Sequence, residues 1–172
     1  MPVTVRLLDL PRMHPLLLWE PIIPATCLVF RQRGSTPPFR FQLAVEGVPG
    51  FGTEVLDLGI DPTGVSPELV ERCERTFEAS RHIEFAGIAV AALGLHVAGA
   101  HEMVDVARRG SAADYLVDAA RHHLEIAGRS RRRDLETAWE QKQPRLLERS
   151  QRGCYLCVTE FETFTGRLVF RG

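Results

Sequence analysis

The stretch ADYLVDAARHHLEIAGRS, residues 113–130, decides the fold of this chain. Two short runs in which apolar and polar residues alternate, 112–117 and 122–128, stand on either side of a few small and polar residues. This pattern predicts two β-strands joined by a tight turn, at Asp118–Arg121 or in its two-residue form at Ala119-Ala120. The hairpin then determines which side chains meet across the two strands.

Either turn gives the same register, in which Tyr115 faces Leu124 and Asp114 faces Glu125. Because side chains alternate between the faces of a strand, one face is apolar and the other carries both acids. Like charges directly opposite each other destabilise a sheet. Two interpretations follow: both carboxylates lie on a solvated face where arginines relieve the repulsion, or a divalent cation such as Mg²⁺ is bound between them.

Elements on either side of the hairpin complete an α/β core. Ser66 is a good N-cap and Pro67 suits the first helical position, so a long helix begins there and runs to about Leu95 or breaks near Gly87. A second helix is expected over 134–149. The remaining expected elements are strands at 102–107, at 154–161 and, along an edge, in the tail 166–172.

Residues 1–62 are interpreted as a β-rich N-terminal arm or subdomain, placed before a core of residues 63–172. The segments 39–45 and 53–58 alternate on either side of a Gly- and Pro-rich turn, which predicts a hairpin. The apolar stretch 14–30 is interrupted by prolines, so it is expected to cross the surface of the core or to pair at a sheet edge.

The composition is that of one globular domain: 172 residues, 45% hydrophobic and 25% charged. The net charge of −1 excludes a global basic field, so any nucleic-acid surface must be local. Four cysteines are too few for a disulfide scaffold. The longest apolar run, near 88–95, is far shorter than the roughly 18 residues of a membrane span, and no secretory signal pattern is present. We expect a cytoplasmic protein without membrane contact.

A third acid, Glu84, continues an apolar row on the first predicted helix. The row 69–73–77–80 follows helical spacing, and its next step is Glu84. A buried carboxylate costs several kcal/mol unless it is paired or bound to a metal. Glu84 therefore joins the two hairpin acids at a metal site, or it lies at the edge of the row and pairs with Arg81 or another arginine.

The order helix, three-stranded meander, helix, strand resembles the core of the PD-(D/E)xK nuclease-like superfamily, over about residues 66–161. Asp114 matches the Asp of that family's second strand, and Glu125 matches the acid of the acid-x-Lys motif on the third. In several branches the first helix adds a Glu, which falls on Glu84. The resemblance implies an αβββαβ restriction-endonuclease-like core, with a mixed sheet flanked by helices.

The lysine of the family motif is replaced here by Ala127. In the family this lysine is thought to orient or activate the attacking water. Either another cation takes its place, Lys142 on the next helix or Arg129 on the strand, or the site is inactive and the fold serves to bind. That helix also presents a Gln in some branches of the family, where Gln141 or Gln143 lies.

A basic cluster follows the third strand, beside the expected acid face; it consists of Arg129, Arg131, Arg132 and Arg133. Arginines in this position suit contact with phosphate, and the alternative is that they are solvated loop charges.

Three further features have a structural interpretation beside a functional one. The stretch WEPIIP around Trp19 is a partner-binding surface or packs on the core. Cys154 and Cys157, three apart on a strand, point to opposite faces and are therefore structural rather than a metal pair. His123 shares the face of the acids, as a ligand or proton shuttle or as a polar turn residue.

Together these features predict a nuclease-like domain that binds nucleic acid, and the family resemblance implies a place in a bacterial defence or DNA-processing system. If it is active, it hydrolyses phosphodiesters with Mg²⁺ or Mn²⁺ held by Asp114 and Glu125 and supported by Glu84, with Lys142 as the catalytic cation. The alternative is a catalytically inactive nuclease-fold subunit, a nucleic-acid-binding or protein-assembly adaptor that docks a partner through the N-terminal arm.

Overall fold

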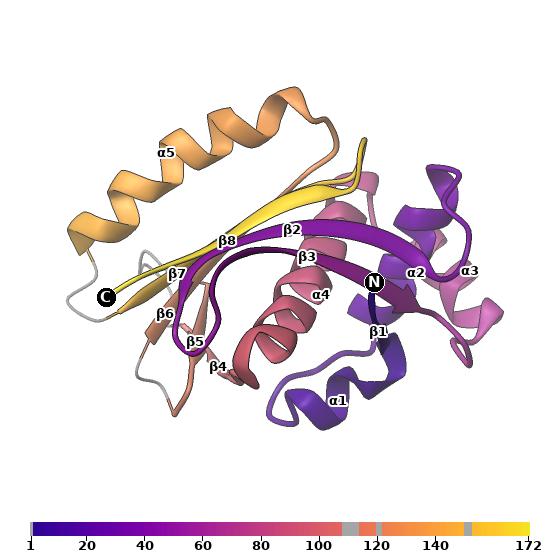
Figure 1. The fold of residues 1–172 in the computed structure, drawn as a ribbon. Helices are drawn as coiled ribbons and strands as arrows, with labels where there is room; N and C mark the ends of the chain where they lie inside the picture. The colour runs from indigo at the N-terminus through magenta and orange to yellow at the C-terminus, as the bar shows by residue number, and fades with distance from the viewer. Residues whose placement is uncertain (1, 108–113, 120–121, 150–152) are drawn as a thin grey trace.

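The computed structural model describes residues 2–107, 114–119, 122–149 and 153–172, the side chains of Leu146, Leu147 and Arg149 excepted. It is a mixed α/β fold with one eight-stranded mixed sheet, in the order β1-β3-β2-β8-β7-β6-β5-β4 (Figure 1). The strands are β1 (Val3–Arg6), β2 (Phe39–Val48), β3 (Gly52–Asp61), β4 (Met103–Val106), β5 (Tyr115–Val117), β6 (His122–Arg129), β7 (Cys154–Glu160) and β8 (Thr165–Arg171).

Helices cover both faces of this sheet. The long helix α4 and its neighbour α2 pack on one face, and α5 lies alone on the other, across β6 and β7 (Figure 1). The helices are η1 (Leu7–Asp9), α1 (Leu10–Met13), α2 (Ile22–Gln32), α3 (Pro67–Thr76), α4 (Ala79–Gly99) and α5 (Arg133–Arg149). Two apolar cores result, a large one under α4 and a small one under α5.

The second half of the chain has the predicted order of elements: α4, the antiparallel strands β4, β5 and β6, then α5 and β7. β6 and β7 are parallel, and α5 makes the crossover between them. The predicted place of the tail is wrong. β8 is not an edge strand but lies between β7 and β2, because its apolar residues, such as Leu168 and Val169, are buried on both faces of the sheet.

The first 62 residues contain the expected hairpin, β2 and β3, but the prediction for 14–30 is wrong. Most of that stretch forms α2, which begins at Ile22 and buries nine consecutive residues. Pro21 and Pro24 stand at the start of this helix, where a missing N–H loses no hydrogen bond. β2 pairs with β8 in parallel, so the arm and the core share one sheet.

The helix expected from Ser66 to about Leu95 is two helices. The N-cap is confirmed, since the Ser66 side chain accepts a hydrogen bond from Leu69 N–H. The helix is interrupted at Phe77 and Glu78, which both have extended backbone, and not near Gly87. Because of this interruption, a row of residues at helical spacing on α3 does not continue onto the same face of α4.

Two glycines let α4 approach the sheet closely. A Cβ at Gly128 on β6 would lie 2.6 Å from Ile83 O, and a Cβ at Gly87 on α4 would lie 3.3 Å from Gly128 Cα. A side chain at either position would therefore push the helix away from the strand. The contact places the first two turns of α4 directly beside the second half of β6.

α4 is also long and apolar enough to cross a membrane by length and composition, but 67% of its apolar window is buried inside the protein. It packs against α2 and β6, which is the environment of a core helix.

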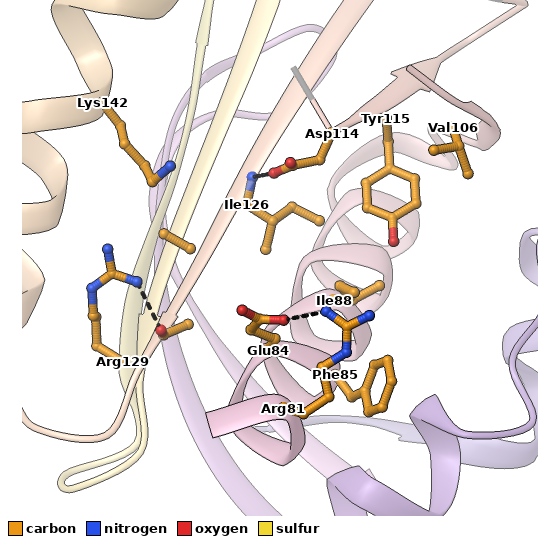
Figure 2. A pocket seen from close by; sticks show the side chains of 12 residues that line it. Arg81, Glu84, Phe85, Ile88, Val106, Asp114, Tyr115, Ile126, Arg129 and Lys142 are labelled. Atoms are coloured by element: carbon orange, nitrogen blue, oxygen red, sulfur yellow. Dashed lines mark hydrogen bonds and ion pairs between the residues drawn. The ribbon is translucent and has the colours of Figure 1, made fainter. Parts of the chain in front are cut away.

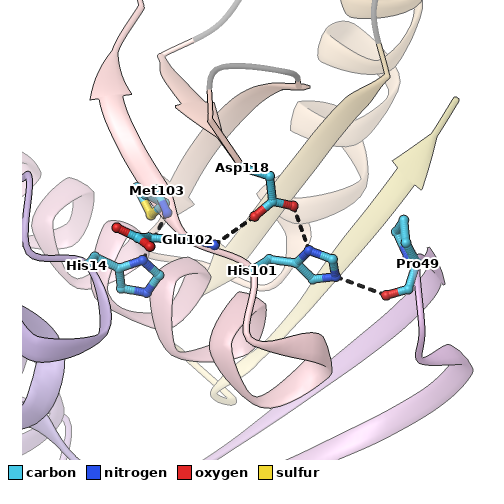
Figure 3. A network of polar contacts seen from close by, with 6 residues as sticks. All are labelled: His14, Pro49, His101, Glu102, Met103 and Asp118. Carbon is cyan, nitrogen blue, oxygen red and sulfur yellow. Dashed lines mark hydrogen bonds and ion pairs between the residues drawn. The ribbon is translucent and has the colours of Figure 1, made fainter.

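Buried polar contacts hold β4 and the β5–β6 turn at one end of the sheet (Figure 3). Met103 N–H donates to His14 Nδ1 over 2.9 Å, so Nε2 carries the ring proton and donates to Ala92 O, also over 2.9 Å. His101 Nδ1 lies 2.7 Å from the carboxylate of Asp118, which also accepts a hydrogen bond from the backbone N–H of Glu102. Burial lowers the pKa of His14, and the neutral ring is therefore the form that fits.

We expect the stability of the protein to depend on pH through His14. The unfolded chain gains a proton on this residue below its ordinary pKa of about 6.5, whereas the folded protein does not. The stabilisation is complete above that pH and is lost as the pH falls toward the lowered pKa. Urea unfolding of the wild type and His14→Gln at about pH 7.5 and about pH 5.5 should show a smaller pH dependence in the variant; equal dependence contradicts this role.

Candidate functional site

A pocket of about 520 Å³ lies against β6, between α4 on one side and α5 on the other (Figure 2). It is lined by Arg81, Glu84, Phe85, Ile88, Val106, Asp114, Tyr115, Ile126, Ala127, Gly128, Arg129 and Lys142. Five of the predicted positions line this pocket: Glu84, Asp114, Ala127, Arg129 and Lys142. Glu125 does not line it.

The pocket lies beside β6, next to the three residues of β5 that pair with it in the described part of the chain. The predicted register is confirmed as far as Tyr115 opposite Leu124, but it ends there. Asp114 N–H donates to Leu124 O over 2.9 Å, and the Asp114 carboxylate accepts the N–H of Ile126 over 2.8 Å. The predicted Asp114–Glu125 pair is therefore wrong, because the Asp114 carboxylate is bonded to the backbone N–H of Ile126 and the Glu125 carboxylate pairs with Lys142.

The backbone of β6 beyond this point faces the pocket. The backbone carbonyl of Leu124 and the backbone N–H of Ile126 point toward the β5 side of the strand. Because backbone direction repeats every two residues in an extended strand, the N–H and C=O groups of Gly128 point to the same side. The carbonyl of Gly128 accepts a hydrogen bond of 3.0 Å from the Arg129 guanidinium. Arg129 is thereby held at the mouth of the pocket, and no acid pairs with it among the residues that the structure describes.

Glu125 faces the other side of β6, where Lys142 of α5 forms an ion pair with it. The side chain of Glu125 is 11% exposed and that of Lys142 is 25% exposed, so water screens this pair only in part. α5 is held in place by Trp139, which is buried on the sheet under the guanidinium of Arg167 at 4.1 Å. Lys142 is the only lysine in the chain.

Glu84 does not lie on the buried face of α4, and that prediction is wrong. Its side chain is 55% exposed and pairs with Arg81 over 2.8 Å, the alternative considered for the sequence. The apolar row was extrapolated across the break at Phe77 and Glu78, where the helical phase changes. The buried stripe of α4 passes through Ile83 and its helical neighbours instead.

The three predicted metal ligands do not form one site as arranged. Glu84 lies on the α4 side of the sheet and Glu125 on the α5 side, and each is paired with a cation, while Asp114 is bonded to the backbone. No group of three His, Cys, Asp or Glu side chains suited to a metal occurs within the described ranges. These carboxylates therefore do not fit Mg²⁺ or Mn²⁺ without rearrangement.

The other arginines of the basic cluster lie outside the pocket lining, in the loop after β6 and at the start of α5. Arg131, Arg132 and Arg133 are all exposed, and the backbone N–H of Arg132 donates to Glu162 over 2.8 Å. The loop is therefore tied to the β7–β8 turn while its guanidinium groups face water.

Tyr115 is a pocket residue that the sequence alone did not single out as functional, because its place in the hairpin marked it as a core residue. It is half-buried, and its ring lies at the side of the pocket opposite Lys142 (Figure 2). Burial raises the pKa of Tyr115, and the neighbouring Asp114 raises it further. The phenol therefore stays protonated and able to donate a hydrogen bond at neutral pH.

The remaining candidates lie outside the pocket. Trp19 is 3% exposed and donates its indole N–H to His14 O, so it packs on the core. Cys154 and Cys157 belong to the two different cores, as opposite faces of β7 require. His123 lies within β6 rather than in the turn. Neither Gln141 nor Gln143, both on α5, lines the pocket. Ala120 and Arg121 of the predicted hairpin turn lie outside the described residues.

Comparison of the chain with protein-family models, with curated proteins and with solved structures finds no match.

We expect the ion pair of Glu125 and Lys142 to be strongly coupled. Lys142→Met should lower the free energy of unfolding by about 1–3 kcal/mol, because it leaves the Glu125 carboxylate nearly buried without its cation. Adding Glu125→Gln should recover part of that loss, since the remaining amide carries no charge. Urea unfolding of the wild type, both single variants and the double variant measures the coupling energy; strictly additive losses contradict the pair.

Proposed function

We propose that this chain is a nuclease-fold domain that binds the phosphodiester backbone of nucleic acid at the β6 pocket. The element order from α4 to β7 supports the resemblance to the PD-(D/E)xK core. Asp114 stands immediately before the second strand of the meander, and Glu125 lies within the third. The pocket lies where these two strands separate.

The observation that carries the proposal is the placement of Arg129. Its side chain lines the pocket, its guanidinium is bonded to a carbonyl and not to an acid among the described residues, and the exposed arginines 131–133 follow it in the sequence. Guanidinium groups bind phosphates through charge-assisted hydrogen bonds. The near-neutral net charge leaves this local surface as the site of attraction.

The function proposed is binding without cleavage, because the acids are already satisfied by other partners. Arg81 pairs with Glu84, Lys142 pairs with Glu125, and the N–H of Ile126 bonds to Asp114. This corresponds to an inactive nuclease-fold adaptor, in a bacterial defence or DNA-processing system if the resemblance extends to the setting of the family. Metal-dependent hydrolysis is the second candidate, favoured by the contact of Lys142 with the motif acid.

Fluorescence anisotropy with a labelled single-stranded oligonucleotide tests the proposal. Arg129→Ala should weaken binding about tenfold at low salt and reduce the slope of log affinity against log salt by about one, as expected when one phosphate contact is lost. Arg40→Ala is the matched control: it removes one charge from the outer face of β2, where Arg40 pairs with Asp57. It should leave the affinity unchanged.

Equal losses in the two arginine variants, or no binding by the wild type, would refute the β6 pocket as the nucleic-acid site. Incubation of the wild type with plasmid and single-stranded DNA, with Mg²⁺, Mn²⁺ or EDTA, distinguishes the second candidate. We expect no cutting in any sample, whereas metal-dependent cutting that Glu125→Ala abolishes would establish the enzyme.

A further inference from the structure

The β6 pocket continues into a second, apolar cleft of about 230 Å³. Ile88, Val106 and Tyr115 line both, so one groove runs from Arg129 across β6 and past the end of β4. Beyond these shared residues the cleft is bordered by Leu16, Leu17 and Leu18, in the segment between α1 and α2, by Ile22 of α2 and by Asp105.

Exposed apolar side chains gather at this cleft. Leu18 is 88% exposed, Leu16 is 68% exposed and Val106 is 61% exposed, whereas most large apolar side chains of the protein are buried. They account for half of the six large apolar side chains that the structure shows as exposed. Apolar residues gathered beside a polar pocket are characteristic of a ligand surface.

The two ends of the groove differ in the chemistry that they accept. At one end Arg129 suits a phosphate, and at the other the surface is apolar, with a single carboxylate, Asp105, on its border. One oxygen of Asp105 accepts the Val106 N–H over 2.8 Å. The negative charge would repel a second phosphate, whereas the other oxygen can accept an N–H group on the edge of a nucleobase. Tyr115, which stays protonated, stands between the two ends.

We infer that the groove binds one nucleotide unit of a single strand, with its phosphate at Arg129 and its unpaired base in the apolar cleft between Val106, Tyr115 and Leu18. This inference rests on the proposed function and adds to it the class of ligand, single-stranded nucleic acid. A base inside a duplex is stacked on both faces and paired at its edge, so it cannot enter the cleft. Apolar and aromatic side chains accept a base face without regard to sequence.

The test compares a short single strand with an abasic strand of the same length and charge. The wild type should bind the normal strand about three- to tenfold more tightly, the range expected for one base contact. Val106→Ser should lower the affinity for the normal strand toward that for the abasic strand, and leave the abasic affinity unchanged. Val55→Ser is the matched control, because Val55 also lies on a strand and is 59% exposed, on β3. It should change neither affinity.

The outcomes separate this inference from the proposed function. Equal binding of both strands by the wild type overturns the base site and leaves a phosphate-binding pocket. No binding of either strand overturns both. If Val106→Ser and Leu18→Ser leave the normal strand's affinity unchanged but alter the sedimentation of the protein, the apolar cleft is covered by a second copy of the chain, and the base site is refuted.

Discussion

The hydrogen bond from Ile126 N–H to the Asp114 carboxylate is the constraint on which the site depends. A backbone N–H without a partner costs about as much as a lost hydrogen bond, so a sheet that stops pairing needs a substitute acceptor. Asp114, immediately before β5, supplies that acceptor to the Ile126 N–H. Within the described ranges no strand pairs with this side of β6 beyond Leu124, and the pocket lies there.

The two walls of the pocket are fixed by unrelated contacts. On one side Gly87 and Gly128 bring α4 against β6, which sets Arg81 and Glu84 beside the strand. On the other side Trp139 anchors α5. The same helix extends Lys142 to Glu125. Because packing fixes each wall, the charged side chains that line the pocket are already in position before a ligand binds.

Local pattern was sufficient for the hairpin, for the order of the core elements and for the opposite faces of Cys154 and Cys157. It failed where distant parts of the chain decide. The tail became a central strand because β2 pairs with it, and the stretch before residue 30 became a helix because the sheet offered an apolar face to cover. The error at Glu84 has a local cause, since two residues of extended backbone reset the helical phase.

The site was harder to anticipate than the fold. Sequence reasoning named Lys142 as a substitute cation, and the structure pairs its ammonium with Glu125; its catalytic role stays a prediction. The sequence could not show that the Asp114 carboxylate would accept the Ile126 N–H, because that contact depends on how the segment before β5 meets β6. Tyr115 and the apolar cleft came from contacts between segments far apart in the chain.

The most direct test of the central claim is an NMR titration of the backbone amides with a short single-stranded oligonucleotide. If the open side of β6 is where nucleic acid binds, the amide signals of Ile126, Gly128 and Arg129 should shift first and most, together with those of the arginine loop. Signals from the outer face of β2 and β3 should stay in place. Shifts confined to that outer face, or no shifts at saturating oligonucleotide, would contradict the claim.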